Sequence, residues 1–356
     1  MQEVDLLVVG LGPGGGSAAL QAARGGVKVL GIEKNRRIGE PVQCAEFIPA
    51  PMSGYARAPG VRVQAIAGMK STLPSGTVVT TDFPGLMVDR ARFDQAIACQ
   101  AEQAGAELWT EARLCRLDAR RRVAVIRRRD QEHQIRYRLL IAADGPHSTT
   151  AALLGLPALE VVQTRQYTVP LRVPYHDTDI WLSDEFPGGY GWLFPKGEVA
   201  NLGIGADRRF EPNLKAPLDR LHAQLVQTGL VGADIVSRTG GAIPVGGLRE
   251  RLVEDGVMFV GDAAGLTHPI TGAGIAAAVV SGERAGRAAV GHLAGDAAAL
   301  ADFEEDVRDQ FQAALERALQ HRARLQQCWR TPLAHDDGVM RRGWIAFQEY
   351  FAERTV

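Results

Sequence analysis

The feature that most limits the fold of this chain is a glycine-rich turn near its N-terminus. An apolar run, residues 4–9, leads into Gly10, Gly12 and Gly15, spaced as G-x-G-x-x-G, with Gly14 at the opening of a small-residue helix. In a strand–turn–helix unit the first glycine permits the tight turn, the second lets a pyrophosphate approach the main chain, and the third lets the helix pack close to the strand. The unpaired N–H groups at the helix start favour an anion. A dinucleotide-binding Rossmann unit is therefore expected.

A second strand and an acid follow at the matching spacing. The apolar run 27–32 ends on Glu33, a residue type that accepts hydrogen bonds from ribose hydroxyls and disfavours a 2′-phosphate. The expected ligand is thus FAD or NAD rather than NADP. A glycine motif alone is weak support for a dinucleotide-binding unit, but here the strand, the helix, the second strand and the acid all occur at the spacing of that unit. Because the motif begins at the N-terminal end, we expect no signal or transit peptide.

Bulk properties exclude several other classes. With 356 residues the chain is expected to form two domains. Forty basic against forty-one acidic residues give a net charge of −1, which argues against a nucleic-acid partner. The four cysteines have no C-x-x-C spacing, so neither a metal site nor a disulfide framework is expected, and a reducing cytoplasm suits them. No apolar stretch is long enough to span a membrane.

Beyond the second strand, Cys44 and Arg90 are candidate residues of the cofactor or substrate site. The proline-containing stretch 39–52 is expected to be a loop, and Cys44 is its reactive residue. The physics of the residue alone favours a small buried side chain over a reactive thiol. A helix is expected over 88–104 with Asp89 as its N-cap. Arg90 in its first turn opposes the helix dipole, so it is either solvated or faces a pyrophosphate.

The middle of the chain is rich in short strands. Three β-like runs between residues 107 and 141 carry arginine clusters at apparent hairpin tips, which predicts a solvated meander and no nucleic-acid site. The last strand ends on Asp144, and an acid at the carboxyl end of a central strand points into the ligand crevice. Residues 161–243 alternate as an antiparallel sheet with one helix over 214–230.

One strand of this sheet carries three aromatic residues. Tyr190, Trp192 and Phe194 alternate in GGYGWLFPKG and therefore share one face. They form either core or an apolar wall that faces a ligand.

A last strand, residues 256–260, leads into a second glycine-rich stretch. Asp262 is placed to bind hydroxyls of a sugar or ribityl chain. Gly272 and Gly274 open a small-residue helix whose N–H groups suit an anionic ring system such as a reduced flavin. Beyond residue 286 the chain is expected to be helical, with arginines and aromatics interleaved. That segment can cover the core, a dimer contact or, as a lower-ranked alternative, an anionic membrane surface.

The glycine turn, VDRARFD, the turn at Asp144 and the Gly261-Asp262 pair together resemble the FAD-dependent oxidoreductases of the p-hydroxybenzoate-hydroxylase-like group. Within that group, PVQCAEF, GGYGWLFPKGEVANLGIG and GDAAGLTHPITGAGI resemble the geranylgeranyl reductase family. The resemblance extends to about Arg287. This chain has Ala45 and Ala273 where family members often have Gly and Glu.

The resemblance implies a set of cofactor contacts, which are Gly10, Gly12, Gly14, Gly15, Glu33, Cys44, Ala45, Arg90, Leu114, Asp144, Asp262, Gly272, Gly274 and Ile275. It also implies an α/β fold, in which a Rossmann-like FAD-binding domain is interleaved with a mainly antiparallel β substrate domain and followed by C-terminal helices. The expected ranges are 1–60, 86–160 and 250–300 for the first, 61–85 and 161–249 for the second, and 301–356 for the helices.

The implied reaction is hydride transfer from reduced FAD to a C=C bond of a hydrophobic, isoprenoid-type or lipid substrate lodged against Tyr190, Trp192 and Phe194. Cys44 is the candidate catalytic residue. No second dinucleotide motif is present, so NAD(P)H is expected to bind transiently, or an electron-donor protein reduces the flavin. A flavin monooxygenase and a flavin electron-transfer protein are the alternatives. The expected location is cytoplasmic, with peripheral membrane contact as a further alternative.

Overall fold

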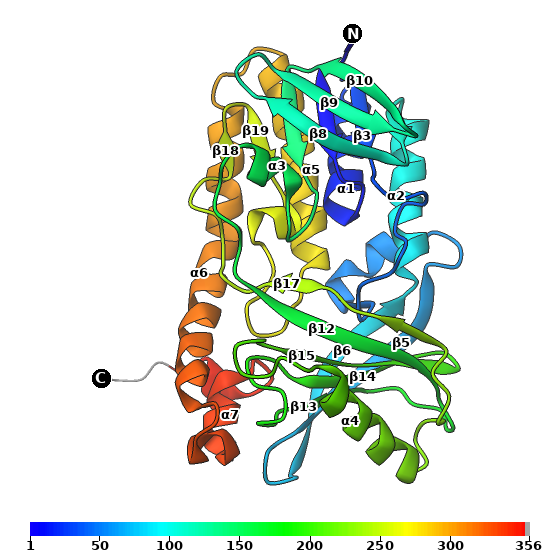
Figure 1. Ribbon diagram of the computed structural model, residues 1–356, viewed down its shortest axis with the longest axis vertical. Helices are drawn as coiled ribbons and strands as arrows, with labels where there is room; N and C mark the ends of the chain where they lie inside the picture. The colour runs from blue at the N-terminus through cyan, green and yellow to red at the C-terminus, as the bar shows by residue number, and fades with distance from the viewer. Residues whose placement is uncertain (353–356) are drawn as a thin grey trace.

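The computed structural model describes residues 1–352 and has two parts stacked along its long axis (Figure 1). The upper part in this view holds the N-terminus and the glycine turn, and the lower part is a large sheet. The long helix α6 (Ala299–Cys328) runs down one side past both parts. The α/β fold class with an interleaved, mainly antiparallel second part is confirmed, because segments from distant parts of the sequence build each sheet.

The upper part is built on a six-stranded sheet with the order β18-β19-β11-β2-β3-β7. Its strands are β2 (Leu6–Val9), β3 (Val29–Ile32), β7 (Glu107–Trp109), β11 (Leu139–Ala142), β18 (Val253–Glu254) and β19 (Val257–Phe259). All neighbours are parallel except the β18–β19 pair. Helices and the meander cover its faces, so β2, β3 and β11 are buried at every position and show no alternation.

Three helices accompany this sheet: α1 (Pro13–Arg24), α2 (Arg90–Gln103) and α5 (Ile275–Leu293). α1 and α5 pack very closely, and a Cβ at Gly282 of α5 would lie 2.1 Å from the carbonyl oxygen of Gly14. The predicted cap of α2 is confirmed, because the Asp89 carboxylate accepts a hydrogen bond from Arg92 N at 2.9 Å. Small residues therefore let two distant segments meet at the glycine turn.

A four-stranded sheet forms the expected meander at one end of the molecule. Its order is β1-β10-β9-β8, with β1 (Gln2–Glu3), β8 (Ala112–Asp118), β9 (Val123–Arg128) and β10 (Gln131–Arg136). The short helix α3 (Thr149–Leu153) follows β11.

The lower part is a nine-stranded sheet with the order β16-β12-β15-β14-β13-β5-β6-β4, in which β17 also pairs with β12. The bounds are β4 (Phe47–Pro49), β5 (Arg62–Thr72), β6 (Val78–Val88), β12 (Val161–Pro170), β13 (Thr178–Trp181), β14 (Gly191–Lys196), β15 (Val199–Ala206), β16 (Ser237–Thr239) and β17 (Ala242–Pro244). Helix α4 (Lys215–Gln227) covers one face through Leu218, Leu221 and Leu225.

The other face of this sheet carries an aromatic-rich cluster closed by the C-terminal segment. After α6 this segment contains η3 (Pro332–His335), α7 (Asp337–Gly343) and η4 (Gln348–Tyr350). Trp329, Trp344 and Phe347 are buried against Trp192 and residues of β5 and β13. Of the alternatives expected for this segment, the structure shows that these aromatics cover the protein's own core. Residues 353–356 of the expected C-terminal range lie outside the described residues.

The structure corrects the expected loop at 39–52. A short strand, β4, pairs with β6, and the 3-10 helix η1 (Ala50–Ala56) follows it. The prolines do not prevent this, because Pro51 lies in the first turn, where its missing N–H has no intrahelical partner. Among residues 1–352, no helix is long and apolar enough to cross a membrane.

Candidate cofactor and substrate site

The glycine turn has the geometry of a backbone cradle. Gly10 has φ +91°, and a Cβ there would lie 2.4 Å from the carbonyl oxygen of Ala143. A Cβ at Gly15 would lie 1.8 Å from the oxygen of Gly10, so helix and strand touch at that point. Gly12 differs, because a Cβ there meets no atom within 4 Å. Gly10 and Gly15 therefore shape the turn, whereas Gly12 leaves space beside the start of α1.

Glu33 lies at the end of β3 and faces this turn. Its Oε2 accepts a hydrogen bond from Leu11 N at 3.2 Å, and its Oε1 accepts one from Asn35 N at 2.9 Å. The side chain is nearly buried. The carboxylate therefore orders the turn itself, and its contact with a ribose stays a prediction.

The loop that carries Cys44 is held between the two parts of the molecule. Gln166 Nε2 in β12 donates to the Cys44 carbonyl at 3.2 Å, and the Gln166 oxygen accepts from Trp192 Nε1 at 3.2 Å. Asn201 Nδ2 in β15 donates to the Ala45 carbonyl at 3.3 Å. The large sheet thus fixes the backbone of Cys44 and Ala45 next to the nucleotide-binding part.

Glu46 is the centre of this arrangement. Its buried carboxylate accepts hydrogen bonds from Lys196 Nζ at 2.8 Å, from Asn201 Nδ2 at 2.9 Å and from Arg90 N at the start of α2 at 2.9 Å. Its φ of +71° is unusual for a residue with a side chain. These bonds hold the loop in that conformation.

The thiol of Cys44 lies in a charged but poorly solvated environment. Its Sγ accepts a hydrogen bond from Glu46 N at 3.2 Å. Burial raises the pKa of the Cys44 thiol, and the nearby Arg90 guanidinium opposes part of that rise. The thiol is therefore protonated at neutral pH.

Arg90 is not simply solvated, since its Nη2 lies 3.0 Å from Asp94 Oδ2 on the next turn of α2, and both side chains are largely buried. Burial raises the pKa of Asp94, and the Arg90 charge acts against that rise. The ion pair explains how a cation is held in the first turn of this helix. Its role toward a pyrophosphate stays a prediction.

Asp262 and the start of α5 lie close together. Asp262 belongs to the 3-10 helix η2 (Gly261–Ala264) and accepts a hydrogen bond from Thr267 Oγ1 at 2.6 Å. A Cβ at Gly274 would lie 3.0 Å from Asp262 Oδ1. Burial raises the pKa of Asp262, and the Thr267 hydrogen bond and the positive charge of Arg90 oppose part of that rise. Gly272, with φ +68°, and Ile275 flank this point.

Two further predicted residues follow strand ends beside the site. A Cβ at Gly10 would lie 3.0 Å from Asp144 Cα. Ala112 N, two residues before Leu114, donates to the Glu33 carbonyl at 2.9 Å. The Leu114 side chain is buried in the core beneath the meander, so only its backbone can reach a ligand. Asp144 accepts hydrogen bonds from Ser148 Oγ at 2.6 Å and from Thr150 N at 2.8 Å at the start of α3. Both of its oxygens therefore already serve the local turn.

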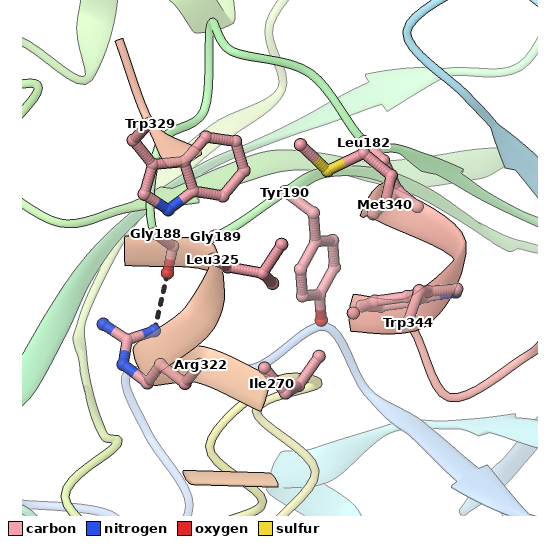
Figure 2. Close-up of a pocket in the computed structure, with 11 residues that line it drawn as sticks. Leu182, Gly188, Gly189, Tyr190, Ile270, Arg322, Leu325, Trp329, Met340 and Trp344 are labelled. Atoms are coloured by element: carbon pink, nitrogen blue, oxygen red, sulfur yellow. Dashed lines mark hydrogen bonds between the residues drawn. The ribbon is translucent and has the colours of Figure 1, made fainter. Parts of the chain in front are cut away.

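The three aromatic residues do share one face, as predicted, and they belong to the aromatic-rich cluster. Trp192 and Phe194 are buried, whereas Tyr190 lines a cavity of about 30 Å³. Figure 2 shows that Ile270, Leu325 and Trp344 surround the Tyr190 ring. The Tyr190 hydroxyl donates to the carbonyl of Thr271 at 2.5 Å, which links this strand to the loop before α5.

Sequence reasoning missed Glu46, Lys196, Asn201 and Gln166. The available signal was the presence of polar residues in otherwise apolar strands, as in GEVANLGIG. Such residues need buried partners, but the sequence does not show which loop supplies them.

The residues present fit FAD. The space beside Gly12 lies at a helix N-terminus that has no side-chain cap. The Asp262 carboxylate accepts one hydrogen bond from residues 1–352 and can accept more from ligand hydroxyls. These two features lie at the two ends of a dinucleotide site. Gly10, Gly12, Gly14, Gly15 and Glu33 would hold the ADP half, and Asp262, Gly274 and Ile275 the flavin half.

Comparison with known proteins identifies the family of this chain. The chain is 34% identical over 322 residues to the digeranylgeranylglycerophospholipid reductase of Methanocaldococcus jannaschii, covering 86% of this chain and 81% of that protein. It is 36% identical over 346 residues to digeranylgeranylglycerophospholipid reductase 1 of Methanopyrus kandleri, covering 88% and 89%. The chain belongs to the geranylgeranyl reductase family of FAD-dependent oxidoreductases.

A solved structure and a family model also match this member of the geranylgeranyl reductase family. A geranylgeranyl bacteriochlorophyll reductase-like protein from Thermoplasma acidophilum has a crystal structure similar to it, with a TM-score of 0.87 at 29% identity, covering 98% of this chain and 93% of that one. The model of the lycopene cyclase protein family matches residues 213–332. The resemblance of the sequence to the geranylgeranyl reductase family is therefore confirmed.

Proposed function

We propose that this protein uses reduced FAD to saturate C=C bonds in the isoprenoid chains of a lipid substrate. Its relatives are named as reductases of digeranylgeranylglycerophospholipid. The observation that carries the proposal is the Cys44 loop, which is bound both to the start of α2 in the nucleotide-binding part and to Gln166 beside Trp192 in the large sheet. When bound, FAD supplies a hydride. Every other requirement falls on this chain.

The chain must hold an apolar alkene and provide a proton. The aromatic-rich cluster that contains the buried Trp192 and Phe194 makes this side of the large sheet apolar, which suits a chain without polar groups. The reduction adds one hydride and one proton to the two carbons, so a proton donor is needed. Cys44 Sγ–H is our candidate donor, because its raised pKa keeps it protonated at neutral pH.

The proposal for the electron donor rests on the lack of a second dinucleotide-binding motif in the sequence. One G-x-G-x-x-G turn follows a strand, and the FAD takes it. We therefore propose that NAD(P)H binds transiently at the flavin, or that a reduced carrier protein delivers the electrons.

The test is an anaerobic single-turnover experiment. The purified protein is reduced with dithionite and mixed with digeranylgeranyl glycerophospholipid in detergent micelles. We expect flavin reoxidation and a product that is heavier by two hydrogens per reduced bond. No reoxidation without oxygen, combined with an oxygen-dependent product sixteen mass units heavier, would favour a monooxygenase instead.

A further inference from the structure

A cavity of about 440 Å³ lies where η1, the start of β5 and the end of β6 meet, and we call it the η1 cavity. Its walls are formed by Ser53, Ala56, Arg57, Ala58, Gly60, Arg62 and Leu86. None of these residues belongs to the glycine turn or to the aromatic-rich cluster. The volume falls in the range of sites for small organic ligands, which is about 300–1,000 Å³.

Two arginines in the wall of the η1 cavity have no partner within the described part of the chain. Arg57 follows the end of η1, and Arg62 is the first residue of β5. Both side chains are exposed, and neither guanidinium forms an ion pair or a hydrogen bond with residues 1–352. Their N–H donors are therefore accessible to a ligand in the cavity.

A third guanidinium, that of Arg92 in α2, lies against the same wall. A Cβ at Gly60 would lie 1.9 Å from Arg92 Nη1, so the absence of a side chain at residue 60 lets this cation approach. Asp89 Oδ2 lies 3.7 Å from Arg92 Nε, and the two side chains are 31% and 61% exposed. The three cations and this one carboxylate carry a net charge of +2.

The η1 cavity adjoins the junction that Glu46 holds. Val88 N donates to the Glu46 carbonyl at 2.9 Å, and Asp89 N donates to the carbonyl of Val61 at 2.8 Å. Val61 lies between two residues of the cavity wall, Gly60 and Arg62. The backbone that fixes the Cys44 loop is thus continuous with the wall of the cavity.

The charge and the lining of the cavity indicate the class of ligand. Guanidinium groups bind phosphate oxygens through their N–H donors, and a net charge of +2 matches a phosphate dianion. The Ser53 hydroxyl can supply one more hydrogen bond. Ala56, Ala58 and Leu86 are apolar, and Leu86 is largely buried. Walls of this kind hold an organic group beside the phosphate rather than a bare ion.

We propose that the η1 cavity binds the phosphate group of an organic phosphate ester, with its oxygens on the guanidinium groups of Arg57 and Arg62 and with Arg92 as a further cation. The proposed function offers two such esters, which are the glycerophosphate headgroup of a lipid substrate and a phosphate group of NADPH. The identity of the ester rests on that proposed function, whereas its binding can be measured without any reaction.

Isothermal titration calorimetry on the FAD-loaded protein at constant ionic strength tests the proposal. The bound FAD prevents nucleotide probes from entering the glycine cradle. The probes are 2′,5′-ADP for the nucleotide and racemic glycerol 1-phosphate for the headgroup, with adenosine, glycerol and sulfate as references. We expect saturable binding of a phosphate ester and none of adenosine or glycerol. The ester that binds more tightly identifies the source of the phosphate.

Variants of the wall make the test specific. Arg57→Gln and Arg62→Gln each remove one guanidinium, so affinity should fall by about tenfold or more in each. Arg92→Gln should weaken binding severalfold, because a neighbouring acid already neutralises part of that charge. Ser53→Asp keeps the arginines and adds a negative charge, and it should lower the affinity by about tenfold or more. Arg113→Gln, at an exposed position of β8, is the control and should bind as the wild type does.

Three results would overturn the proposal. They are no saturable binding of either ester to the wild type, sulfate binding as tight as that of the esters, or wild-type affinity in both Arg57→Gln and Arg62→Gln. Circular dichroism verifies folding of each variant, and if one arginine variant fails to fold, the other and Ser53→Asp decide. Ester binding by a protein that reduces no alkene would support this site and contradict the proposed function.

Discussion

Lys196 in β14 and Glu46 in the Cys44 loop form an ion pair of 2.8 Å that joins the large sheet to the nucleotide-binding part. The two side chains are 20% and 5% exposed. Glu46 also accepts hydrogen bonds from Asn201 and from the first N–H of α2. The pair therefore fixes the loop at the junction where cofactor and substrate are expected to meet.

Replacing Lys196 with Met should destabilise the protein by about 2 kcal/mol, because the Glu46 carboxylate stays buried without its cation. Chemical denaturation measures the change. Arg220→Met is the matched control, since that arginine forms a 2.9 Å pair with Glu185 in which both side chains are more than half exposed. The control should show no resolvable loss. Equal effects of the two substitutions would mean that the buried pair does not anchor the loop.

Two glycine substitutions should separate folding from cofactor binding. Gly12→Ala adds a Cβ to open space at an ordinary φ of −68°, so we expect a cost of about 1 kcal/mol or less but a lower FAD content. Gly282→Ala places a Cβ 2.1 Å from the backbone of Gly14 and should cost about 2 kcal/mol or more. Thermal denaturation and the flavin-to-protein absorbance ratio give the two readouts. Full FAD retention in the Gly12 variant would contradict the cradle.

Cys44→Ser should keep FAD and thermal stability while losing alkene reduction, because a serine hydroxyl is a far weaker acid than a thiol. Cys99→Ser, at an exposed position of α2, is the control and should turn over normally. The wild-type rate should fall only above the ordinary pKa of cysteine, since burial raises the pKa of the Cys44 thiol. Normal activity of the Cys44 variant would assign the thiol to packing.

His268, in the loop before α5, should make stability depend on pH. Burial lowers its pKa to about 4, against 6.5 for the free side chain. The neutral His268 side chain contributes fully to the stability of the folded protein above pH 6.5. This contribution is lost as the pH falls toward 4, because the histidine of the unfolded chain takes up a proton at a higher pH than that of the folded protein. The shift corresponds to about 3 kcal/mol. Unfolding of His268→Gln at a series of pH values should lack this part of the dependence, and an unchanged curve would argue against a neutral buried imidazole.

Asp179 in β13 should give the stability of the protein the opposite dependence on pH. Burial raises its pKa to about 6, although the Tyr175 hydroxyl donates to it at 2.8 Å. The folded protein holds this proton when the unfolded chain has released it, so stability falls by about 3 kcal/mol as the pH rises from about 4 to 6. Asp179→Asn keeps an acceptor for Tyr175 and should be more stable than the wild type at pH 7. Equal stability at pH 4 and a gain at pH 7 are the expected pair of results.

Much of the site could be predicted because its signals are local. Gly10 and Gly15 are required by the turn itself, Gly12 leaves space beside it, and the spacing to Glu33 follows from one strand–helix–strand unit. The alternation from Tyr190 to Phe194 fixed a common face in the same way, because strand periodicity depends only on neighbours along the chain.

The partners of those residues could not be predicted. The sequence did not indicate that Arg90 pairs with Asp94, and its role toward a pyrophosphate stays a prediction. The stretch 39–52 was expected to be a loop, although part of it pairs with β6. Nothing in the local pattern around Glu46 indicates that Lys196 lies against it, 150 residues along the chain.

The sequence by itself therefore determined the Rossmann unit, the cofactor class and the family, because each is written in short-range spacing of glycines, acids and aromatics. Only the tertiary structure decided that Glu46 organises the Cys44 loop and that the Tyr190 hydroxyl bonds to the loop before α5. The physical reason is that buried polar groups select partners by proximity in three dimensions, and that proximity follows from the packing of whole sheets and helices.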